Sequence, residues 1–292
     1  MVKSYLFYLN TSHKIIGSWN DYGVKSQRQK KVEGCEALRI ILQNSPKSDF
    51  DVARGISLIE EHAIEITTLK SFTRNLDLCG VSKIGITGAP GVGKSTFMNM
   101  LIPRIDLSSH KVAIIAIDPS SRISKGAILG DRIRITQNAK FDEIYFRSMA
   151  TRGAYGGMNA SAEAVLFFLN QCGFTLIFVE TVGVGQNEVE VASYVDCVIH
   201  IVDSNAGDEV QMEKAGVMEV GDIYFVNKRE NKENLQFISS LKTFAANSIR
   251  MSGKSPAVVV GSVLSGEGFE EIVRLLNLFT ANSNNLDCEK MQ

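Results

Sequence analysis

The sequence predicts an α/β fold of three layers, in which a mostly parallel sheet of about seven strands lies between helices. Two observations carry this prediction: short apolar runs alternate with amphipathic stretches from residue 82 onward, and the runs are apolar along most of their length. Strands that are apolar throughout are typical of a sheet buried on both faces. Strand alternating with helix implies right-handed crossovers, which put helices on both sides of the sheet.

The expected elements follow one another in regular order. The apolar runs predict strands over residues 83–87, 111–117, 143–148, 175–180, 197–203, 222–227 and 257–262. The amphipathic stretches predict helices over residues 94–105, 160–171, 209–220, 234–248 and 269–279. Ligands of such sheets bind at the carboxyl ends of the strands, so functional residues are expected in the loops that follow the runs.

One helix is expected ahead of the sheet, over residues 48–69. Ser48 can cap its first turn, with Asp51 three residues later as the partner in a capping box. Apolar residues recur at helical spacing along it: Val52, Ile56, Ile59, Ala63 and Ile66. We expect a poorly structured tail, a helical extension, a main domain and a polar tail over residues 1–47, 48–80, 81–280 and 281–292.

Composition and charge exclude several classes of partner. The formal net charge of −1 gives no overall field for nucleic acid or an anionic membrane, and no run approaches the roughly 18 apolar residues of a membrane span. The five cysteines are scattered without a C-x-x-C pair, which suits reduced thiols inside a cell and disfavours a nickel or zinc site. We expect a cytoplasmic protein, with the mitochondrial matrix as the alternative if the basic segment over residues 1–31 is a transit peptide.

The string "GITGAPGVGKST" contains Gly88-x-x-x-x-Gly93-Lys94-Ser95 between a predicted strand and a predicted helix. Glycines let the backbone wrap around phosphates, a lysine reaches the β and γ oxygens, and a serine binds Mg²⁺. A glycine turn would explain the glycines but not the Lys-Ser pair that follows. The expected nucleotide contacts are Gly88, Ala89, Pro90, Gly91, Val92, Gly93, Lys94, Ser95 and Thr96. The motif alone leaves kinase, ATPase and GTPase open.

Three acids lie beside the ends of predicted strands: Asp118 in "DPSS", Asp131 in "ILGD" and Glu180 in "ETVGVGQ". A carboxylate there can hold Mg²⁺ directly or through water, so we predict a metal site from these acids and Ser95. A helix cap or a turn is the alternative for each acid alone. Gly183 is expected to offer its backbone N–H to the γ-phosphate, in a segment that reorders when phosphate leaves.

The predicted catalytic residues are Lys94, Asp118, Glu180 and Arg147. Arg147 and Arg152 flank "SMAT", near the expected path of a switch loop, where either can stabilise charge on the γ-phosphate. A structural or solvated arginine is the alternative for both. Because no group that positions the attacking water is evident, we expect slow intrinsic hydrolysis.

The string "VNKRE" follows a predicted strand and has the form of a loop that reads a nucleotide base. In such loops an Asn amide bonds the N7/O6 side of guanine, a Lys stem covers its face, and a carboxylate accepts from the N1 and N2 hydrogens. Asn227, Lys228 and Glu230 are the corresponding residues. Glu230 stands where Asp is usual and is longer by about 1.5 Å. We therefore expect GTP to bind better than ATP, with weaker selectivity than Asp would give.

The chain carries several such strings in the order, and at roughly the spacings, of one family: "GITGAPGVGKST", "AIDPSSRISKGAILGDRIRI", "FRSMATRGAYGG", "ETVGVGQNEVEVA", "DSNAGDEVQMEKAG", "VNKRE" and "SVLSGEGFEE". It resembles the MeaB/ArgK-type P-loop GTPases, the family of the methylmalonic aciduria type A protein. The resemblance covers about residues 50–280 and implies that residues 81–280 form a P-loop GTPase domain.

The resemblance implies GTP and GDP as ligands and Mg²⁺ as cofactor. It implies a G-protein chaperone of an adenosylcobalamin-dependent mutase, especially methylmalonyl-CoA mutase. Family members commonly carry a longer C-terminal helical arm for dimerisation; only a short polar tail is expected here, which leaves a homodimer open.

Residues of the family's site carry over by position. Asp118 and Asp131 match metal-associated acids, and Glu180 matches an altered switch acid. Residues 205–214 match an extra switch that couples the nucleotide to the mutase. A second base-contacting loop corresponds to Ser262, Val263 and Leu264.

Other functions stay open on the sequence alone. A P-loop kinase or ATPase, the latter under the family's older arginine-transport label, would share the phosphate motif, although a kinase needs an acceptor site and usually a basic lid. A nucleotide-dependent binding module with slow turnover is a further alternative. Phosphate release without an acceptor would exclude the kinase, and persistence of bound GTP would identify the binding module.

Overall fold

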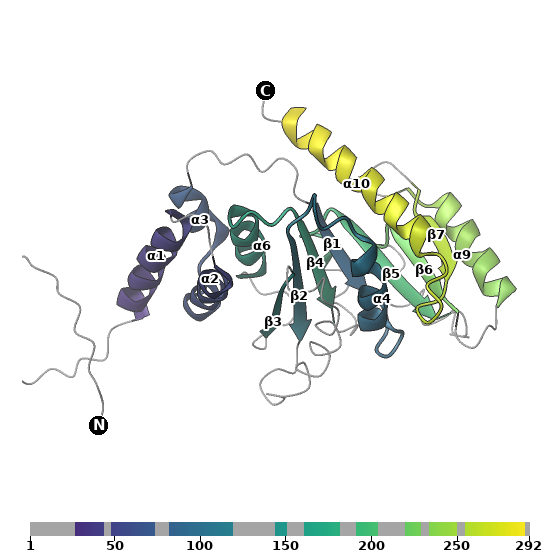
Figure 1. Ribbon diagram of the computed structural model, residues 1–292, viewed down its shortest axis with the longest axis horizontal. Coiled ribbons are helices and arrows are strands. Elements are labelled where there is room, and N and C mark those ends of the chain that lie inside the picture. The colour runs from purple at the N-terminus through teal and green to yellow at the C-terminus, as the bar shows by residue number, and fades with distance from the viewer. Residues whose placement is uncertain are drawn as a thin grey trace, which may run out of the picture.

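The computed structural model describes residues 27–43, 48–73, 82–118, 144–150, 161–181, 191–203, 220–228, 234–249 and 255–289. Within these ranges, seven strands form one sheet in the order β3-β2-β4-β1-β5-β6-β7 (Figure 1). All neighbouring strands run parallel. The strands are β1 (Ser82–Thr87), β2 (Val112–Asp118), β3 (Tyr145–Ala150), β4 (Leu176–Thr181), β5 (Cys197–Asp203), β6 (Ile223–Asn227) and β7 (Ala257–Gly261). The predicted α/β fold is confirmed.

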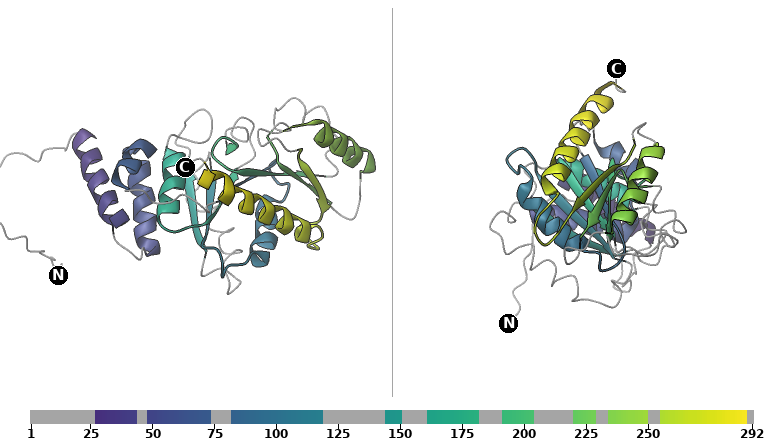
Figure 2. Two further views of the ribbon diagram at one scale, coloured as in Figure 1. Left: turned by 90° about the horizontal axis from the view of Figure 1, so that it is seen from above. Right: turned by 90° about the vertical axis from the view of Figure 1, so that its right-hand side faces the viewer.

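Helices cover both faces of this sheet (Figure 2). On one face lie α4 (Lys94–Leu101), the short 3-10 helix η1 (Ile102–Arg104) and α10 (Phe269–Glu289), which share one apolar cluster with strands of the sheet. On the other face lie α6 (Ser161–Gln171) and α9 (Leu235–Asn247). The three layers follow from strands whose residues are apolar on both sides and need cover on both sides.

Three further helices lie beyond strand β3: α1 (Gln27–Gln43), α2 (Asp49–His62) and α3 (Ile66–Phe72) (Figure 1). Helices α2 and α3 pack on α6, and α1 packs on α2 and α3. Helix α2 approaches α6 closely at Gly55, where an added Cβ would lie 2.1 Å from the ring of Phe168. These helices therefore extend the core from the sheet toward the N-terminus.

Helix α1 corrects the prediction of a poorly structured tail over residues 1–47, which is wrong for Gln27–Gln43. Leu38 is fully buried and Ile41 nearly so, in the same apolar cluster as α2 and α6. Most other residues of α1 are polar or charged, so the sequence shows little helical periodicity there.

The single helix predicted over residues 48–69 is in fact two helices, separated at Ala63. Ala63 has the left-handed backbone conformation, with φ of 46°, and its N–H donates to the Ile59 carbonyl, which ends α2. The start of α2 agrees with the prediction: Ser48 and Asp51 form a capping box. A glycine usually occupies such a helix end, so alanine gives no warning in the sequence.

Helix α10 continues to Glu289, beyond the helix end expected at residue 279, so most of the expected polar tail over residues 281–292 is helical. No glycine or proline interrupts residues 269–289, so a helix that is anchored at its start by Phe269 and Ile272 can continue. The predicted helix over residues 209–220 lies outside the described residues except for its last residue.

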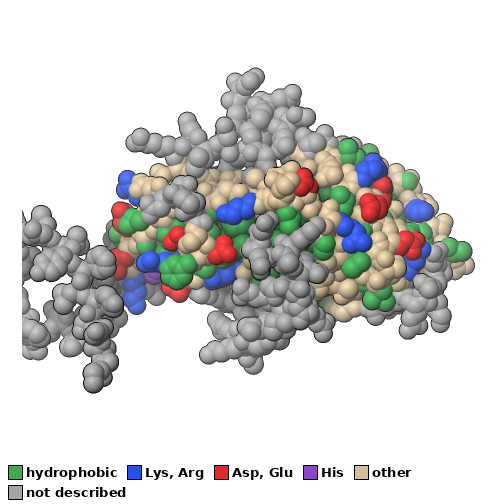
Figure 3. Space-filling model, viewed as in Figure 1, with side chains coloured by type: hydrophobic (Ala, Val, Ile, Leu, Met, Phe, Trp, Pro, Cys, Tyr) green, Lys and Arg blue, Asp and Glu red, His purple; other side chains and the backbone are tan. Residues whose placement is uncertain are grey.

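Charged side chains of both signs are interspersed over the described part of the face that Figure 3 shows. This distribution agrees with the balanced composition and the formal net charge of −1. Among the described helices, none is long and apolar enough to cross a membrane.

Candidate functional site

The loop between β1 and α4 has a backbone that requires glycine. Gly88, Gly91 and Gly93 have φ of 137°, 76° and 106°, in the region that side chains disfavour. A Cβ on Gly88 would lie 2.3 Å from the Ile201 carbonyl oxygen of β5. The loop therefore passes directly over the end of the neighbouring strand, at the carboxyl edge of the sheet.

Lys94 begins α4 and is 8% exposed. Its Nζ donates to the carbonyl oxygens of Gly88, at 2.6 Å, and Ala89, at 3.0 Å. The loop thus surrounds the ammonium group, which lies beside the N-terminus of α4. Backbone N–H groups at a helix N-terminus beside a lysine form an arrangement suited to phosphate, so the phosphate contacts stay a prediction that this geometry fits.

Ser95 and Glu180 meet across the sheet edge, where the Ser95 hydroxyl donates to Glu180 Oε1 at 2.9 Å. Glu180 pairs in register with Ile86 of β1, next to the loop. The backbone of Asp118 ends β2 one residue beyond Ile117, which pairs with Thr181 of β4. A hydroxyl and a carboxylate are oxygen ligands of the kind Mg²⁺ takes, so this donor set fits the ion.

Two predicted phosphate-side residues, Asp131 and Gly183, lie outside the described residues, as does Glu230 of the base loop. Within the described ranges, no group of three or more His, Cys, Asp or Glu side chains could hold a metal ion.

Asn227, the last residue of β6, connects two loops. Its Nδ2 donates to the Val92 carbonyl of the phosphate loop at 2.9 Å, and its Oδ1 accepts from the Val263 N–H at 3.1 Å. The side chain is 2% exposed, so both bonds are protected from water. Sequence reasoning expected Asn227 at the base, but not this connection between the phosphate loop and the loop after β7.

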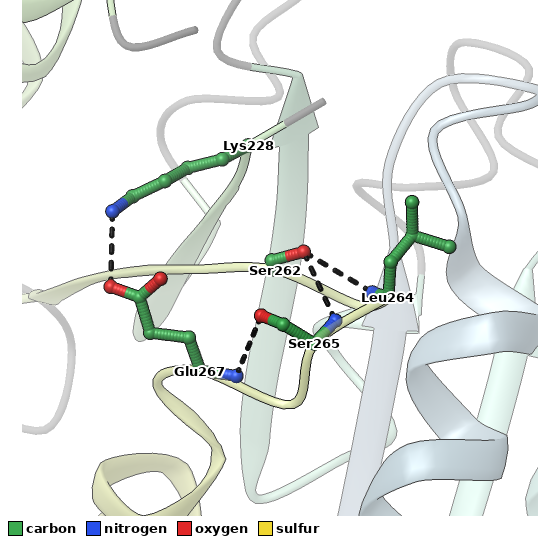
Figure 4. A network of polar contacts seen from close by, with 5 residues as sticks. All are labelled: Lys228, Ser262, Leu264, Ser265 and Glu267. Atoms are coloured by element: carbon green, nitrogen blue, oxygen red, sulfur yellow. Dashed lines mark hydrogen bonds and ion pairs between the residues drawn. The ribbon is translucent and has the colours of Figure 1, made fainter. Parts of the chain in front are cut away.

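The loop after β7 has its own internal hydrogen bonds (Figure 4). The Ser262 hydroxyl accepts from the backbone N–H groups of Leu264, at 3.2 Å, and Ser265, at 3.4 Å. The side chain of Leu264 is 79% exposed, although it is a large apolar group. Next to this loop, Lys228 Nζ donates to Glu267 Oε1 at 3.0 Å. Glu267 was not predicted as a site residue.

His200 is a second residue that the sequence did not single out. It lies on β5 in register with Thr87, the last residue of β1 before the phosphate loop. Both His200 Nδ1 and Thr87 Oγ1 are buried without a hydrogen-bond partner. Burial and, to a smaller extent, the positive charge of Lys94 together lower the pKa of His200 from 6.5 to about 4. The imidazole is therefore neutral near pH 7.

Arg147 is the predicted catalytic residue that the structure does not bring to this cluster. It lies in the middle of β3, in register with Ile115, and not at the carboxyl end of the strand. Its guanidinium donates to Ser57 Oγ at 2.9 Å and to Glu60 Oε2 at 3.1 Å, both on α2. These contacts attach α2 to the sheet, which favours the structural alternative for Arg147 over the catalytic one.

The arrangement brings the glycine-rich loop before α4, the Ser95–Glu180 pair and Asn227 together along one edge of a parallel sheet. A family model described as "Methylmalonyl Co-A mutase-associated GTPase MeaB" matches residues 52–288. The chain belongs to this family. The match includes α10 almost to its end and excludes α1, so the MeaB-type part of the chain begins within α2.

Relatives with similar sequences carry related names. The chain is 38% identical over 199 residues to GTPase ArgK of Escherichia coli, a match that covers 66% of this chain and 60% of that protein. It is 32% identical over 197 residues to the mouse protein named "Methylmalonic aciduria type A homolog, mitochondrial", a match that covers 65% of this chain and 47% of the relative. The chain thus spans less than two thirds of the length of either relative.

A solved structure has the same fold. The crystal structure of a LAO/AO transport system kinase superposes with a TM-score of 0.56 at 24% sequence identity, and covers 89% of this chain and 82% of that one. At this identity the likeness supports the three-layer α/β fold and nothing about substrates.

Proposed function

We propose that this MeaB-family protein binds guanine nucleotide with Mg²⁺, hydrolyses GTP slowly, and acts as a chaperone of an adenosylcobalamin-dependent mutase of the methylmalonyl-CoA mutase type. The single observation that carries the nucleotide part is the Asn227 side chain, which joins the phosphate loop to the loop after β7. Because Asn227 contacts both loops, it can contact a base on one side and hold the phosphate loop in position on the other.

The base contacts follow from the chemistry of Asn227. A side-chain amide nitrogen carries two hydrogens, so the bond to the Val92 carbonyl leaves a second donor for the N7/O6 side of guanine. The Lys228 stem and the exposed Leu264 side chain lie beside the same loop and are suited to cover the faces of a flat base. Glu230 would accept from the N1 and N2 hydrogens, which adenine does not offer in that pattern.

The phosphate contacts follow from the loop after β1. Lys94 and the first N–H groups of α4 would hold the β- and γ-phosphates, and Gly183 would add a backbone N–H to the γ-phosphate. Ser95 and Glu180, together with Asp118 and Asp131, are the proposed Mg²⁺ ligands, directly or through water. When bound, the ion would neutralise charge on the phosphate oxygens.

Hydrolysis would proceed by attack of water on the γ-phosphorus. The bond to the β-phosphate oxygen breaks, and GDP, inorganic phosphate and a proton are released. Lys94 would stabilise the charge that develops on the oxygens in the transition state. The guanidinium of Arg147 is engaged with Ser57 and Glu60 on α2, and Arg152, the other candidate arginine, lies outside the described residues. Slow intrinsic turnover stays part of the proposal.

The mutase partner is supported by the description of the matched family and by the name of the mouse relative. The segment over residues 205–214 is the proposed coupling switch. Residues 81–280 are the proposed GTPase domain, which follows a helical extension over residues 48–80.

We place the protein in the cytoplasm, with the mitochondrial matrix as the alternative that the mouse relative's name supports. Neither a membrane nor a nucleic acid is a proposed partner, and a homodimer is compatible with the longer α10.

Two measurements test this proposal. Purified protein with GTP and Mg²⁺, and no acceptor, should release inorganic phosphate slowly, and affinity capture from the native organism with nucleotide present should recover a cobalamin-dependent mutase. Lack of phosphate release without an acceptor would contradict the GTPase assignment and favour a kinase. Capture that never recovers a mutase, with or without nucleotide, would contradict the chaperone role.

A further inference from the structure

We propose that Glu267 is a positioning residue of the base site: its carboxylate holds Lys228 in place and thereby sets how tightly a purine is bound. This inference rests on the proposed function, because it concerns the same nucleotide site. Glu267 belongs to the turn that precedes α10, not to the Asn-Lys loop. It lies within the string "SVLSGEGFEE", of which only Ser262, Val263 and Leu264 were expected to contact the base.

The contact between the two side chains is direct. Lys228 Nζ donates to Glu267 Oε1 at 3.0 Å, across 39 residues of sequence (Figure 4). The Lys228 side chain is 12% exposed and the Glu267 side chain 58% exposed, so the pair lies at the rim of the site. The backbone N–H of Lys228 also donates to the Gly261 carbonyl at 2.8 Å, which fixes the start of the lysine stem beside the same turn.

The backbone around Glu267 is built to hold this carboxylate. Gly266 and Gly268 on either side have φ of 82° and 84°, so the turn is tight and allows little variation at these two positions. The Glu267 carbonyl accepts from the Ser262 N–H at 3.1 Å, and a Cβ on Gly261 would lie 2.3 Å from that carbonyl oxygen. Glu267 is therefore attached to the same loop whose Val263 N–H bonds to Asn227.

A lysine needs such a partner if its stem is to cover a base. The stem has four carbons and loses about 2 kcal/mol of rotamer freedom when it is fixed. With its ammonium group held by Glu267, the chain lies extended between two fixed ends before any ligand arrives. Pre-organisation of this kind raises affinity by lowering the entropy lost on binding.

The test compares Glu267→Gln with Glu271→Gln in the full chain, by titration with GTP, GDP and ITP in the presence of Mg²⁺. Glu271 is a matched control, since it is an exposed glutamate of α10 that pairs with Arg274 at 2.6 Å, away from Lys228. E267Q should weaken all three nucleotides by the same factor of about two to five, the size expected for a partly exposed ion pair. E271Q should leave all three unchanged.

Two further comparisons separate positioning from a general structural role. In a Lys228→Met background, E267Q should have no additional effect, because the group through which it acts is gone. Raising the salt concentration should weaken nucleotide binding more in the wild type than in E267Q, because salt screens the ion pair. The 2-amino group distinguishes GTP from ITP and is not touched by a lysine stem over the ring face, so the GTP-to-ITP ratio should stay constant.

Equal affinity of E267Q and the wild type would overturn the inference, while GTP binding by the wild type would still support the proposed function. Failure of the wild type to bind GTP would overturn both. A loss for GTP alone, with ITP unchanged, would also overturn it, because Glu267 would then read the base itself. If E267Q does not fold by circular dichroism, Glu267→Asp decides instead: it withdraws the carboxylate by about 1.5 Å, and unchanged affinity would refute the positioning role.

Discussion

At the scale of single residues, the site depends on side chains held by buried hydrogen bonds and on glycines that larger residues cannot replace without a clash or strain. Asn227 has both ends of its amide engaged in buried hydrogen bonds to separate loops. Lys94 is enclosed by carbonyl groups of its own loop, and Gly88 lies against a strand carbonyl. A buried polar group that loses its partner costs about 1–3 kcal/mol, so changes at such positions affect folding as well as binding.

Replacement of Gly88 by alanine should be far more harmful than replacement of Gly91. Both glycines have positive φ, which costs an alanine about 1–2 kcal/mol. A Cβ at Gly88 also meets backbone 2.3 Å away, whereas a Cβ at Gly91 meets nothing within 4 Å. Urea unfolding should show a loss of about 3 kcal/mol or more for Gly88→Ala and about 1 kcal/mol for Gly91→Ala. Equal losses of unfolding free energy in the two variants would show that Gly88 is not in close contact with the backbone of β5.

His200 should make stability depend on pH. Its pKa falls from 6.5 to about 4 on folding, so between these values the unfolded chain binds more protons and stability decreases as the pH decreases. The contribution approaches about 1.4 kcal/mol per pH unit in that window. Urea unfolding at pH 7, 6 and 5 should show a steeper decrease for the wild type than for His200→Gln. Parallel decreases for the two proteins would refute the buried, neutral histidine.

At the scale of elements, the sequence predicts what is regular and misses what depends on distant contacts. All seven strands occur where apolar runs predict them, because strands buried on both faces need such runs. Helix α1 was not predicted, because it buries few residues. The end of α2 was not predicted, because Ala63 adopts a left-handed conformation that glycine usually takes. The contact of Arg147 with α2 joins residues 87 positions apart, which no local pattern reveals.

The cap of α2 gives a prediction at this scale. The Ser48 hydroxyl accepts from the Asp51 N–H, and the Asp51 carboxylate accepts from the Ser48 N–H, both at 3.2 Å. Ser48→Ala should lower the free energy of unfolding by about 1 kcal/mol. Ser71→Ala, at an exposed site on α3, is the control and should change it by less than about 0.5 kcal/mol. If both variants unfold at the same urea concentration, the box does not stabilise the helical extension.

At the scale of the whole molecule, the carboxyl edge of the sheet collects the candidate site residues, and helices α1, α2 and α3 lie to the side, beyond the edge strand β3 (Figure 1). The strands are all parallel, so β1, β4, β6 and β7 deliver their last residues to the same edge (Figure 1). The alternation of strands and helices, together with the motifs, was enough to place the candidate residues at the carboxyl ends of the strands. The structure brings four of them to this edge: Lys94, Ser95, Glu180 and Asn227. The sequence could not predict Glu267 or His200, whose roles arise only from contacts across the fold.

The most direct test of the central claim is competition between GTP and ATP for the purified chain with Mg²⁺, repeated on Asn227→Ala and on Glu230→Asp. GTP should bind more tightly than ATP by a factor between about 10 and 10⁴. Asn227→Ala should weaken GTP by about tenfold or more, whereas Asn277→Ala, at an exposed position of α10, should not. Glu230→Asp should raise the selectivity for GTP. Equal binding of ATP and GTP by the wild type, with no change in Glu230→Asp, would contradict the assignment of a guanine site.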